Sequence, residues 1–528
     1  FKQKTAYEIM PSLVGSEMCI RDRLYKLYGN LTCLTRYQQP LTLNFCTASI
    51  LPMYGITSYA TYIPWLRLTP DTDGWPHSFQ RSVANFDEDA ITMGVAAGKL
   101  CLHKSDLSKI KALLFCSTSA PYAEKQNAAV IAAALNLPSH VLTVDLAGSI
   151  RSSTSAIYLA LDMIQATPEE SVLIISSDTR MGMARSPLDD SFGDGAAAIL
   201  LGQEDPVAII ESKSSQTSIL YDLWRDSSSS FVSQWEDRFV ADNGVESLMI
   251  DSVQSILSAA KLDMSQIYKL AINAPNLRQA NRIKRLLNAT DSQLNTSLLE
   301  LIGNTGCSMA IMELCLALDQ ISEKDQYICL SCYGDGVDSF LIKSTRAYNS
   351  RGKDRESTML SINTGHPLSS YEEYATLKHL WQTGESVRRP DTSPPSVPAI
   401  YREQTKNIHF QGGKCDHCGY VQYPAQKICV NCQEQHPSSV VNLSSARAIL
   451  FTYSKDYLAG TTDVPLVICT INFDTGGRML CVMTDRNIED LHVNMPLEMS
   501  FRKISEHKGV TSYSWKAMPI RLEKGEQA

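Results

Sequence analysis

The chain has 528 residues, of which 44% are hydrophobic and 20% are charged, and its formal net charge is −8. This length exceeds the roughly 50–250 residues of a typical domain, so we expect at least two hydrophobic cores. The acidic balance weighs against nucleic acid or an anionic membrane as the main partner, because both attract basic surfaces. The sequence contains no apolar run of about 18 residues, as a membrane-spanning helix would need. Fifteen cysteines without a dense disulfide-like spacing favour a reducing, cytoplasmic location.

The N-terminal segment differs from the rest of the chain. Thr5–Arg23 reads TAYEIMPSLVGSEMCIRDR, which is like a translated sequencing adapter. It lacks the basic and then apolar order of a signal peptide. We therefore interpret residues 1–52 as a non-native extension and begin the first domain at residue 53. A genuine disordered extension is the alternative.

Apolar runs alternate with helical patterns over residues 53–345. Strands are predicted at Ala112–Ser117, Val141–Leu146, Ser171–Ser176 and Ala196–Leu201, and helices at Ala128–Leu135 and Thr154–Ile164. The alternation recurs with strands at Lys269–Ile272, Tyr327–Ser331 and Ser339–Ile342 and helices at Leu248–Ala260, Gln279–Leu287 and Met309–Leu318. This order predicts an α/β domain with buried strands, and its recurrence is consistent with an internal duplication.

Residues 346–404 have the composition of a linker with one helix. An amphipathic helix is predicted at Tyr371–Gln382, and Arg389–Pro398 is proline-rich and extended. A zinc-binding module is predicted at residues 405–440. Residues 441–528 contain about five short alternating strands and little helix, which predicts a small β-barrel.

The sequence CDHCGYVQYPAQKICVNC carries four cysteines in the spacing C-x2-C-x10-C-x2-C. Each C-x2-C pair can form a tight turn that directs two thiolates to one point. Two such turns make a tetrahedral four-sulfur site that suits zinc, with iron as the second choice. The predicted ligands are Cys415, Cys418, Cys429 and Cys432. Because four protein ligands leave no open position, we expect a structural metal.

Residues of about 370–525 resemble a family of small acyl-CoA-associated proteins. Gly412–Cys415, Tyr423-Pro424 and Met495–Leu497 carry this resemblance. It implies an N-terminal helix, a rubredoxin-like zinc ribbon and an OB-fold barrel that accompany a thiolase-like enzyme. Because the sequence has no basic, aromatic-studded strand, it disfavours a nucleic-acid role for the barrel.

Residues 53–345 resemble the thiolase superfamily, especially 3-hydroxy-3-methylglutaryl-CoA synthases and 3-oxoacyl-carrier-protein synthase III. Phe192–Ala198, Gly303–Ser308 and Asn276–Ile283 carry the resemblance. It implies a thiolase-like, duplicated and layered α/β fold, an acyl-CoA as substrate or ligand, and a homodimer. A separate thiolase is a further implied partner.

The resemblance also implies a catalytic cysteine, a histidine, an asparagine and, in the synthases, a glutamate. The cysteine position falls on Ser149 or Ile150, and the histidine position on Asn273 or Ala274. The glutamate position is Thr118, and only Asn304 agrees with the family. Cys116 and Cys307 are interpreted as buried core thiols. Tyr333 is a further acid–base candidate, because related aldolases that lack the cysteine are thought to use tyrosine. The candidate catalytic residues are Ser149, Asn273, Asn304 and Tyr333.

Three functions follow from this pattern. The first is an acyl-CoA acyltransferase or condensing enzyme with non-standard active-site residues. The alternatives are an aldolase that acts on an acyl-CoA and a non-catalytic acyl-CoA-binding scaffold for a partner thiolase. In each case we expect the barrel to lie near the mouth of the larger domain's pocket and to help hold the acyl-CoA.

Overall fold

A computed structural model describes residues 54–295, 297–345, 357–381, 396–435, 438–461 and 463–521. The predicted extension at residues 1–52 and the proline-rich residues 389–395 lie outside the described residues. By its contacts, Pro52–Ala528 forms one compact unit. Within the described residues, no helix is long and apolar enough to cross a membrane.

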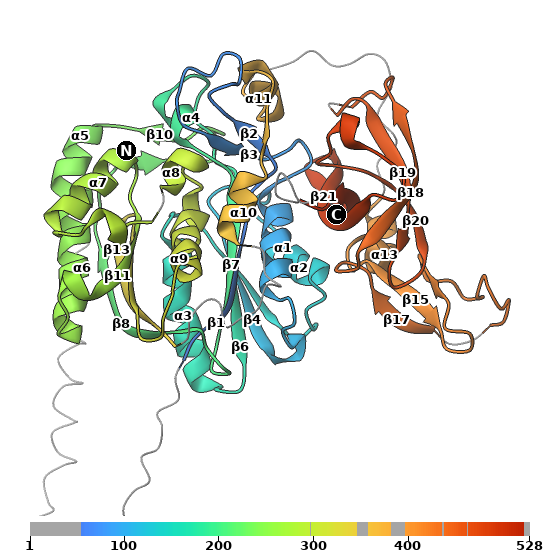
Figure 1. Ribbon diagram of the computed structural model, residues 1–528, viewed down its shortest axis with the longest axis horizontal. Helices are drawn as coiled ribbons and strands as arrows, with labels where there is room; N and C mark the ends of the chain where they lie inside the picture. The colour runs from blue at the N-terminus through green and yellow to red at the C-terminus, as the bar shows by residue number, and fades with distance from the viewer. Residues whose placement is uncertain are drawn as a thin grey trace, which may run out of the picture. The chain divides into compact units, whose positions relative to one another are not determined.

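A nine-stranded mixed sheet forms the centre of the larger domain, in the order β11-β12-β13-β8-β1-β7-β6-β4-β5 (Figure 1). Its strands are β1 Gly55–Tyr62, β4 Ile110–Cys116, β5 Leu142–Leu146, β6 Ser171–Asp178, β7 Gly195–Gly202, β8 Ala208–Thr217, β11 Ile267–Asn273, β12 Tyr327–Tyr333 and β13 Gly336–Ser344. All the strands predicted for this domain are present.

The two halves of this sheet repeat one pattern of strand pairing. In one half, β4 pairs parallel with β6, β6 antiparallel with β7, and β7 antiparallel with β1. In the other half, β11 pairs parallel with β12, β12 antiparallel with β13, and β13 antiparallel with β8. The repeat supports the expected internal duplication.

Helices cover both faces of the sheet. On β6, Val172 and Ile174 belong to a core shared with α3 (Ser152–Ala166) and α9 (Met309–Asp319), whereas Leu173 and Ile175 belong to a core shared with α1 and α2. α1 spans Ala90–Cys101, α2 Asn127–Ala134, α6 Glu246–Ala260 and α7 Leu277–Leu286. Because α3 and α9 also contact each other, the helix after β5 and the helix after η5 (Gly306–Ser308) come together on one face.

Shorter elements complete the larger domain. They are β2 Leu66–Leu68, β3 Arg81–Val83, α4 Pro187–Ser191, β9 Leu223–Trp224, β10 Ser233–Gln234, α5 Asp237–Val240, the π-helical turn η2 Ala241–Val245, and α8 Leu298–Leu301, with one-turn 3-10 helices at Leu107–Lys109, Met264–Gln266 and Asp291–Gln293.

The described part of the predicted linker packs against the larger domain. It forms α10 Thr358–Asn363, β14 His366–Pro367, which pairs with β2, and α11 Tyr371–Leu377. Tyr374 donates a hydrogen bond of 2.7 Å to the buried Asp189, and the Lys378 ammonium lies 2.7 Å from Asp194. The predicted helix to Gln382 is too long. It ends at Leu377, because Lys378 turns inward to Asp194 and His379 adopts a left-handed φ of 51°.

The C-terminal part begins with two short helices, α12 Val397–Arg402 and α13 Gln404–Asn407. A three-stranded sheet follows, with β15 Gln411–Cys415, β16 Val421–Gln422 and β17 Ser438–Asn442. The last sheet has the order β20-β19-β18-β21-β22. Its strands are β18 Ala448–Asp456, β19 Leu466–Phe473, β20 Arg478–Val482, β21 Pro496–His507 and β22 Val510–Pro519, with a 3-10 turn at Ile488–Asp490.

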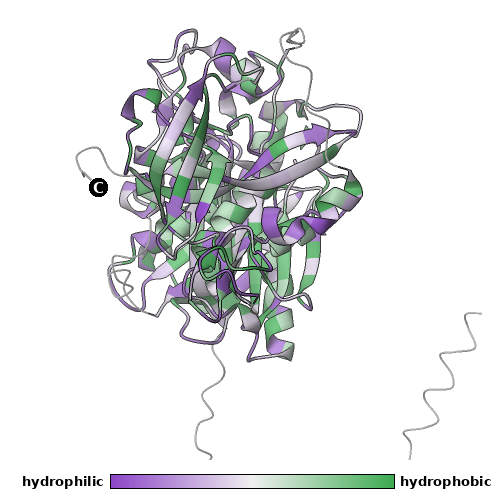
Figure 2. Ribbon diagram, turned by 90° about the vertical axis from the view of Figure 1, so that its right-hand side faces the viewer, coloured by the Kyte–Doolittle hydropathy of each residue, from purple (hydrophilic) through white to green (hydrophobic). Residues whose placement is uncertain are grey.

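This last sheet curls so that its two ends meet. Met483, directly after β20, forms a bridge with Ala517 of β22. Buried and half-buried residues alternate along β19, as expected for a strand with one inward face. Figure 2 shows hydrophilic and hydrophobic residues mixed along the strands on this side of the molecule. This closed five-stranded sheet, Ala448–Pro519, is called the barrel below.

The barrel packs directly on α1 and on the loop before it. Residues of α1, α2 and the barrel share one hydrophobic core. Inside this contact, Arg502 lies 3.1 Å from both Asp87 and Glu88 and 2.5 Å from Asp485. Lys516 lies 2.8 Å from Asp87. The barrel is thus held by buried ion pairs and is not merely tethered by the linker.

Candidate functional sites

Two glycine-containing segments meet at the centre of the larger domain. Phe192 forms a bridge with Asn304, and the Gly193 amide donates a hydrogen bond of 3.1 Å to the Asn304 carbonyl. A Cβ atom on Gly193 would lie 1.8 Å from the Ile302 carbonyl oxygen. The close approach therefore requires glycine at residue 193 and places Asn304 against Phe192.

A cavity of about 240 Å³ opens beside Asn304. Its walls come from α4, the segment before α5, the loop after β11 and α7. The lining residues are Pro187, Leu188, Ser191, Phe192, Asp222, Leu223, Gln234, Trp235, Val240, Pro275, Asn276, Gln279 and Asn304. The volume lies below the roughly 300–1,000 Å³ of drug-sized pockets, so it suits a small group such as the end of a larger ligand.

The Asn304 side chain is buried and held at both ends. Its Oδ1 accepts a hydrogen bond of 3.0 Å from the Gly306 amide, and its Nδ2 donates one of 3.4 Å to the Pro275 carbonyl. An amide nitrogen carries two hydrogens, so Nδ2 keeps one donor for a ligand. Asn304 can therefore donate a hydrogen bond to an oxygen atom in the cavity.

The other three candidate residues lie near the segment Cys332–Gly334 at the end of β12. Asn273 is buried, and its Nδ2 donates a hydrogen bond of 3.3 Å to the Cys332 thiol, next to Tyr333. A Cβ atom on Gly334 would lie 3.1 Å from the Ser149 hydroxyl oxygen. Of the four predicted catalytic residues, only Asn304 is among the residues that line the cavity.

Ser149 lies in the turn before α3, where the resemblance implies a nucleophile. Its hydroxyl oxygen accepts a hydrogen bond of 3.3 Å from the Arg151 amide, and its carbonyl accepts one of 3.4 Å from the Cys307 thiol. Burial and then the charge of Asp178 raise the pKa of the Cys307 thiol well above its usual range. Cys307 is therefore a neutral thiol at physiological pH and a poor nucleophile, as expected for a core cysteine.

Tyr333 is completely buried at the end of β12. Burial raises the pKa of its hydroxyl, and the nearby charges of Asp222 and Asp335 raise it further. The phenol therefore stays protonated and can donate a hydrogen bond, but it is a weak proton donor and cannot act as a base near neutral pH. Asp222, whose charge acts on the Tyr333 hydroxyl, also lines the Asn304 cavity.

Two charged residues at the end of β6 were not predicted from the sequence. Asp178 accepts six hydrogen bonds, from the residues Ser117, Thr118 and Ser119 and from the Cys307 amide. These donors occupy the carboxylate, so Asp178 serves to hold the loop after β4 and not as a free base. Thr118, at the family's glutamate position, is one of these donors.

Arg180, two residues further, is the second unpredicted group. Only 6% of its surface is exposed, its guanidinium carbon lies 4.3 Å from the centre of the Phe192 ring, and its Nη1 is buried without a hydrogen-bond partner. Both residues directly follow an apolar strand. The carboxyl ends of parallel strands commonly carry ligand-binding groups, and this signal could have indicated them.

The four predicted metal ligands come together in the C-terminal part. All four sulfur atoms lie within 4.8 Å of one another, with 3.8 Å between Cys415 and Cys432 and 3.5 Å between Cys418 and Cys429. A tetrahedral zinc site with Zn–S bonds of about 2.3 Å has sulfur–sulfur edges of about 3.8 Å. Gly419 has the left-handed φ of 72° expected after the second cysteine. The group can hold a tetrahedral metal ion.

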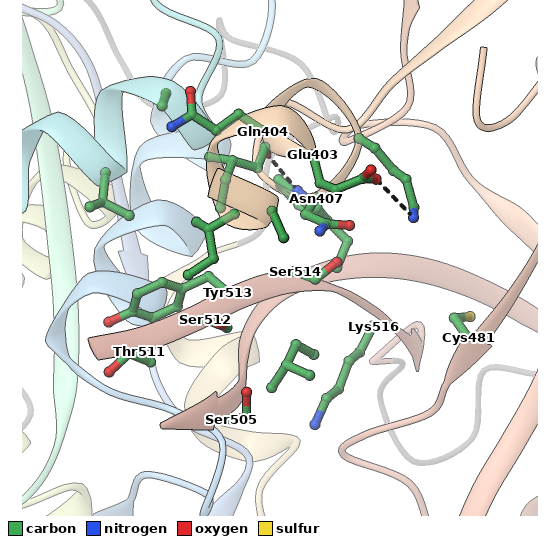
Figure 3. A pocket seen from close by; sticks show the side chains of 18 of the residues that line it. Glu403, Gln404, Asn407, Cys481, Ser505, Thr511, Ser512, Tyr513, Ser514 and Lys516 are labelled. Atoms are coloured by element: carbon green, nitrogen blue, oxygen red, sulfur yellow. Dashed lines mark hydrogen bonds and ion pairs between the residues drawn. The ribbon is translucent and has the colours of Figure 1, made fainter. Parts of the chain in front are cut away.

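A second, larger hollow of about 980 Å³ lies between α2, the two short helices before β15, and the barrel. Figure 3 shows Gln404 and Asn407 above it and Thr511–Ser514 of β22 below it. Ala129 and Val130 of α2 also line it. The expected place of the barrel therefore needs correction: barrel residues line this hollow, but none of them is among the residues that line the Asn304 cavity.

Comparisons with known proteins relate the larger domain to one group of enzymes. A hydroxymethylglutaryl-CoA synthase from Methanocella arvoryzae is 27% identical over 307 residues, which cover 55% of this chain and 88% of the relative. One from Thermoplasma acidophilum is 25% identical over 352 residues, which cover 63% of this chain and the whole relative. No protein-family model matches the chain.

Solved structures show the same fold. An HMG-CoA synthase in complex with CoA is similar with a TM-score of 0.53 at 16% identity, covering 65% of this chain and 96% of that structure. A 3-oxoacyl-(acyl carrier protein) synthase III from Pseudomonas aeruginosa PAO1 has a TM-score of 0.50 at 19% identity, covering 56% and 98%. The larger domain therefore has the thiolase-like α/β fold that the sequence predicted.

Proposed function

We propose that this chain binds CoA thioesters in the Asn304 cavity and catalyses acyl transfer or condensation, as a hydroxymethylglutaryl-CoA-synthase-like protein of the thiolase superfamily. The observation that supports this proposal most directly is Asn304, the one catalytic residue of the family that this sequence retains. It lies in a cavity with an amide hydrogen free to donate. The relatives, matched over 84–100% of their length, bear the name of an enzyme that handles CoA thioesters.

The chemistry of this site centres on polarising a carbonyl. A hydrogen bond from Asn304 Nδ2 to the thioester oxygen stabilises the negative charge that develops there when the carbonyl carbon is attacked. Ser149 has no histidine to act as its base, and the thiols of Cys116 and Cys307 have pKa values raised first by burial. Transfer therefore proceeds without a cysteinyl thioester: the second substrate attacks the thioester carbon directly, the carbon–sulfur bond breaks, and the departing CoA sulfur takes up the proton that the attacking group loses. Ser149 and Asn273 position the turn before α3 and the loop after β11.

Two alternatives use the same bound thioester. In the aldolase alternative, Tyr333 acts as the proton donor, although its raised pKa makes it a weak acid. In the scaffold alternative, the chain binds an acyl-CoA without turnover and presents it to a partner thiolase. The aldolase predicts loss of product with Tyr333→Phe, whereas the scaffold predicts no product without the partner.

The C-terminal part contributes a structural metal and a binding barrel. One Zn²⁺ is bound in a rubredoxin-like ribbon by Cys415, Cys418, Cys429 and Cys432. The closed five-stranded sheet that follows is an OB-fold barrel. Cys418→Ser should remove the zinc and unfold the ribbon, because a structural site contributes folding energy locally. The matched control is Cys329→Ser in β12, which should leave one zinc per chain by elemental analysis. A full zinc content in Cys418→Ser would contradict this role.

The assembly is a homodimer in the cytoplasm. β5 is an edge strand of the large sheet, and its Leu142 side chain is 51% exposed, so a second copy can extend the sheet across a two-fold axis. Light scattering of the whole chain should give twice the monomer mass, and Leu142→Lys should reduce it. A monomer at micromolar concentration would contradict this assignment.

The test of function is turnover by the whole chain, because the buried contact with the barrel makes a truncated larger domain unsuitable. Labelled acetyl-CoA is mixed with a second CoA thioester, and released CoA and labelled product are measured. Asn304→Ala should slow product formation about 100- to 1,000-fold, while Asn472→Ala in the barrel should not change it. A wild-type chain that binds CoA thioesters but forms no product, with or without a thiolase, would reject the enzyme assignment.

A further inference from the structure

Two cysteines of the barrel face each other across neighbouring strands. Cys469 of β19 and Cys481 of β20 are direct partners in an antiparallel ladder that runs without a bulge from Ile468 to Asn472. Both are free thiols, and their sulfur atoms lie 3.6 Å apart. Directly opposed residues of antiparallel strands have Cα atoms about 4.5–5.5 Å apart, which is inside the range of about 4.4–6.8 Å found in disulfides. The backbone therefore already has the spacing that a disulfide between them needs.

The two thiols differ in their access to small solutes. Cys469 is 1% exposed and belongs to the hydrophobic core of the barrel, together with Val467 and Ile471 of the same strand. Cys481 is 9% exposed and is one of the residues that line the hollow of about 980 Å³ beside the barrel (Figure 3). Cys469 is not among those lining residues. A small solute in the hollow therefore meets the sulfur of Cys481 first.

The two thiols also differ in acidity. A hydrogen bond from the Cys469 thiol lowers the pKa of Cys481, although burial acts in the opposite direction, and the amide of Ala517 lowers it further. The same contact with Cys481, followed by burial, raises the pKa of Cys469. Because the thiolate is the form of cysteine that reacts with oxidants, Cys481 is the more reactive thiol. Cys469 is a neutral thiol held directly beside it.

We infer that Cys469 and Cys481 form a redox-active pair, in which a hydroperoxide that enters the hollow oxidises Cys481 and Cys469 then closes a disulfide. In the first step the Cys481 thiolate attacks one peroxide oxygen, the O–O bond breaks, and the leaving hydroxide becomes water with the proton that Cys481 released. The product is a sulfenic acid. In the second step the Cys469 sulfur attacks the sulfenic sulfur, the S–O bond breaks, and the departing hydroxide takes up the Cys469 proton as water. Two thiols and one hydrogen peroxide thus give one disulfide and two water molecules.

This pair is separate from the proposed acyl-CoA site and from the metal group. Neither cysteine lines the Asn304 cavity, and neither is one of the four sulfur atoms that can hold a metal ion. The disulfide joins two strands that are already neighbours, so the strand order of the barrel does not change. A dithiol reverses the bond by exchange, as is usual for the transient disulfides of reducing compartments. The site therefore records exposure to peroxide in a reversible form.

Peptide mapping of the whole chain tests the inference. Trypsin cuts after Arg478, between the two cysteines, and so places Cys469 and Cys481 in separate peptides with one cysteine each, Asp456–Arg478 and Met479–Arg486. After brief exposure to hydrogen peroxide, the remaining thiols are alkylated in denaturant and the digest is analysed by mass spectrometry without reductant. The two peptides should appear joined, and a dithiol added before alkylation should separate them. Separate, alkylated peptides at a peroxide exposure that oxidises other cysteines of the chain would overturn the inference.

Three variants assign the roles of the two thiols. In Cys469→Ser, Cys481 should stop at the sulfenic acid, which dimedone labels. In Cys481→Ser, Cys469 should be oxidised at least about tenfold more slowly than in the wild type. The control Cys329→Ser, in the buried strand β12, should form the disulfide as the wild type does. Equal oxidation of Cys469 in Cys481→Ser and in the wild type would overturn the role of Cys481 as the reacting thiol. If a variant does not fold, the joined or separate peptides of the wild type still decide.

Discussion

Arg502 and Arg180 are both buried, yet their surroundings differ. Arg502 lies within 3.1 Å of Asp87, Glu88 and Asp485, whereas Arg180 has no ion pair among the described residues. Burial alone would lower the pKa of each guanidinium. Around Arg502, the carboxylates and Tyr62 reverse this effect and raise its pKa, but the pKa of Arg180 stays lowered.

The difference separates a charge with ion-pair partners from a buried charge without them. Arg502 joins the barrel to the larger domain, because Asp87 and Glu88 precede α1 and Asp485 follows β20. Its network is complete without a ligand. Arg180 stacks on Phe192, which lines the cavity, and it has no ion pair among the described residues. One arginine thus joins the barrel to the larger domain through ion pairs, and the other is held by packing on an aromatic ring.

The largest expected effect is that of Arg502→Met on stability. The substitution removes a shared cation from three buried carboxylates and leaves Glu88 without an ion pair among the described residues, which should lower the free energy of unfolding by about 3–5 kcal/mol. Urea denaturation of the whole chain measures it. Lys508→Asn is the control, an exposed lysine with a φ of 51° that asparagine also adopts. A loss below about 1 kcal/mol would show that the network does not hold the barrel.

A smaller effect is expected at Glu313, a buried carboxyl without a cation. Burial raises its pKa from 4.5 to about 7, although a hydrogen bond from Asn295 opposes the shift. A carboxyl with a raised folded pKa takes up a proton on folding, so its contribution to stability falls as pH rises from 4.5 to about 7. Glu313→Gln should remove up to about 3 kcal/mol of this loss. Identical pH profiles of unfolding for wild type and variant would contradict the shift.

The smallest stability change is expected at Arg180 itself. Arg180→Met removes a buried cation that has no partner, so the free energy of unfolding should change by less than about 1 kcal/mol or increase. Urea denaturation without ligand gives this value. A loss of about 3 kcal/mol, similar to that of Arg502→Met, would mean that Arg180 is a structural residue after all.

Local patterns predicted much of this molecule. The four cysteines lie within 18 consecutive residues, and each C-x2-C turn brings its pair together by itself. The apolar strands were recognisable because both of their faces are covered by helices. The end of α11 was not recognisable from the sequence, because it depends on the contact between Lys378 and Asp194, which are far apart in the chain.

The reacting region was predicted only in part, for the same reason. Asn304 was found through its glycine-rich surroundings, but Gln279 gains meaning only when α7 lines the same cavity as Asn304. Asn273 follows the strand as expected, yet its side chain is bonded to Cys332. Nothing in the local sequence of Arg502 or Asp87 indicates that they will be paired across the barrel contact.

Acetyl-CoA binding to two tryptophan variants tests the location of the site most directly. Leu223→Trp narrows the Asn304 cavity, and Ala129→Trp narrows the hollow beside the barrel. Calorimetry should show that wild type and Ala129→Trp bind acetyl-CoA equally and that Leu223→Trp binds at least about tenfold more weakly. Loss of binding in Ala129→Trp, with full affinity in Leu223→Trp, would place the acyl-CoA beside the barrel and contradict the account.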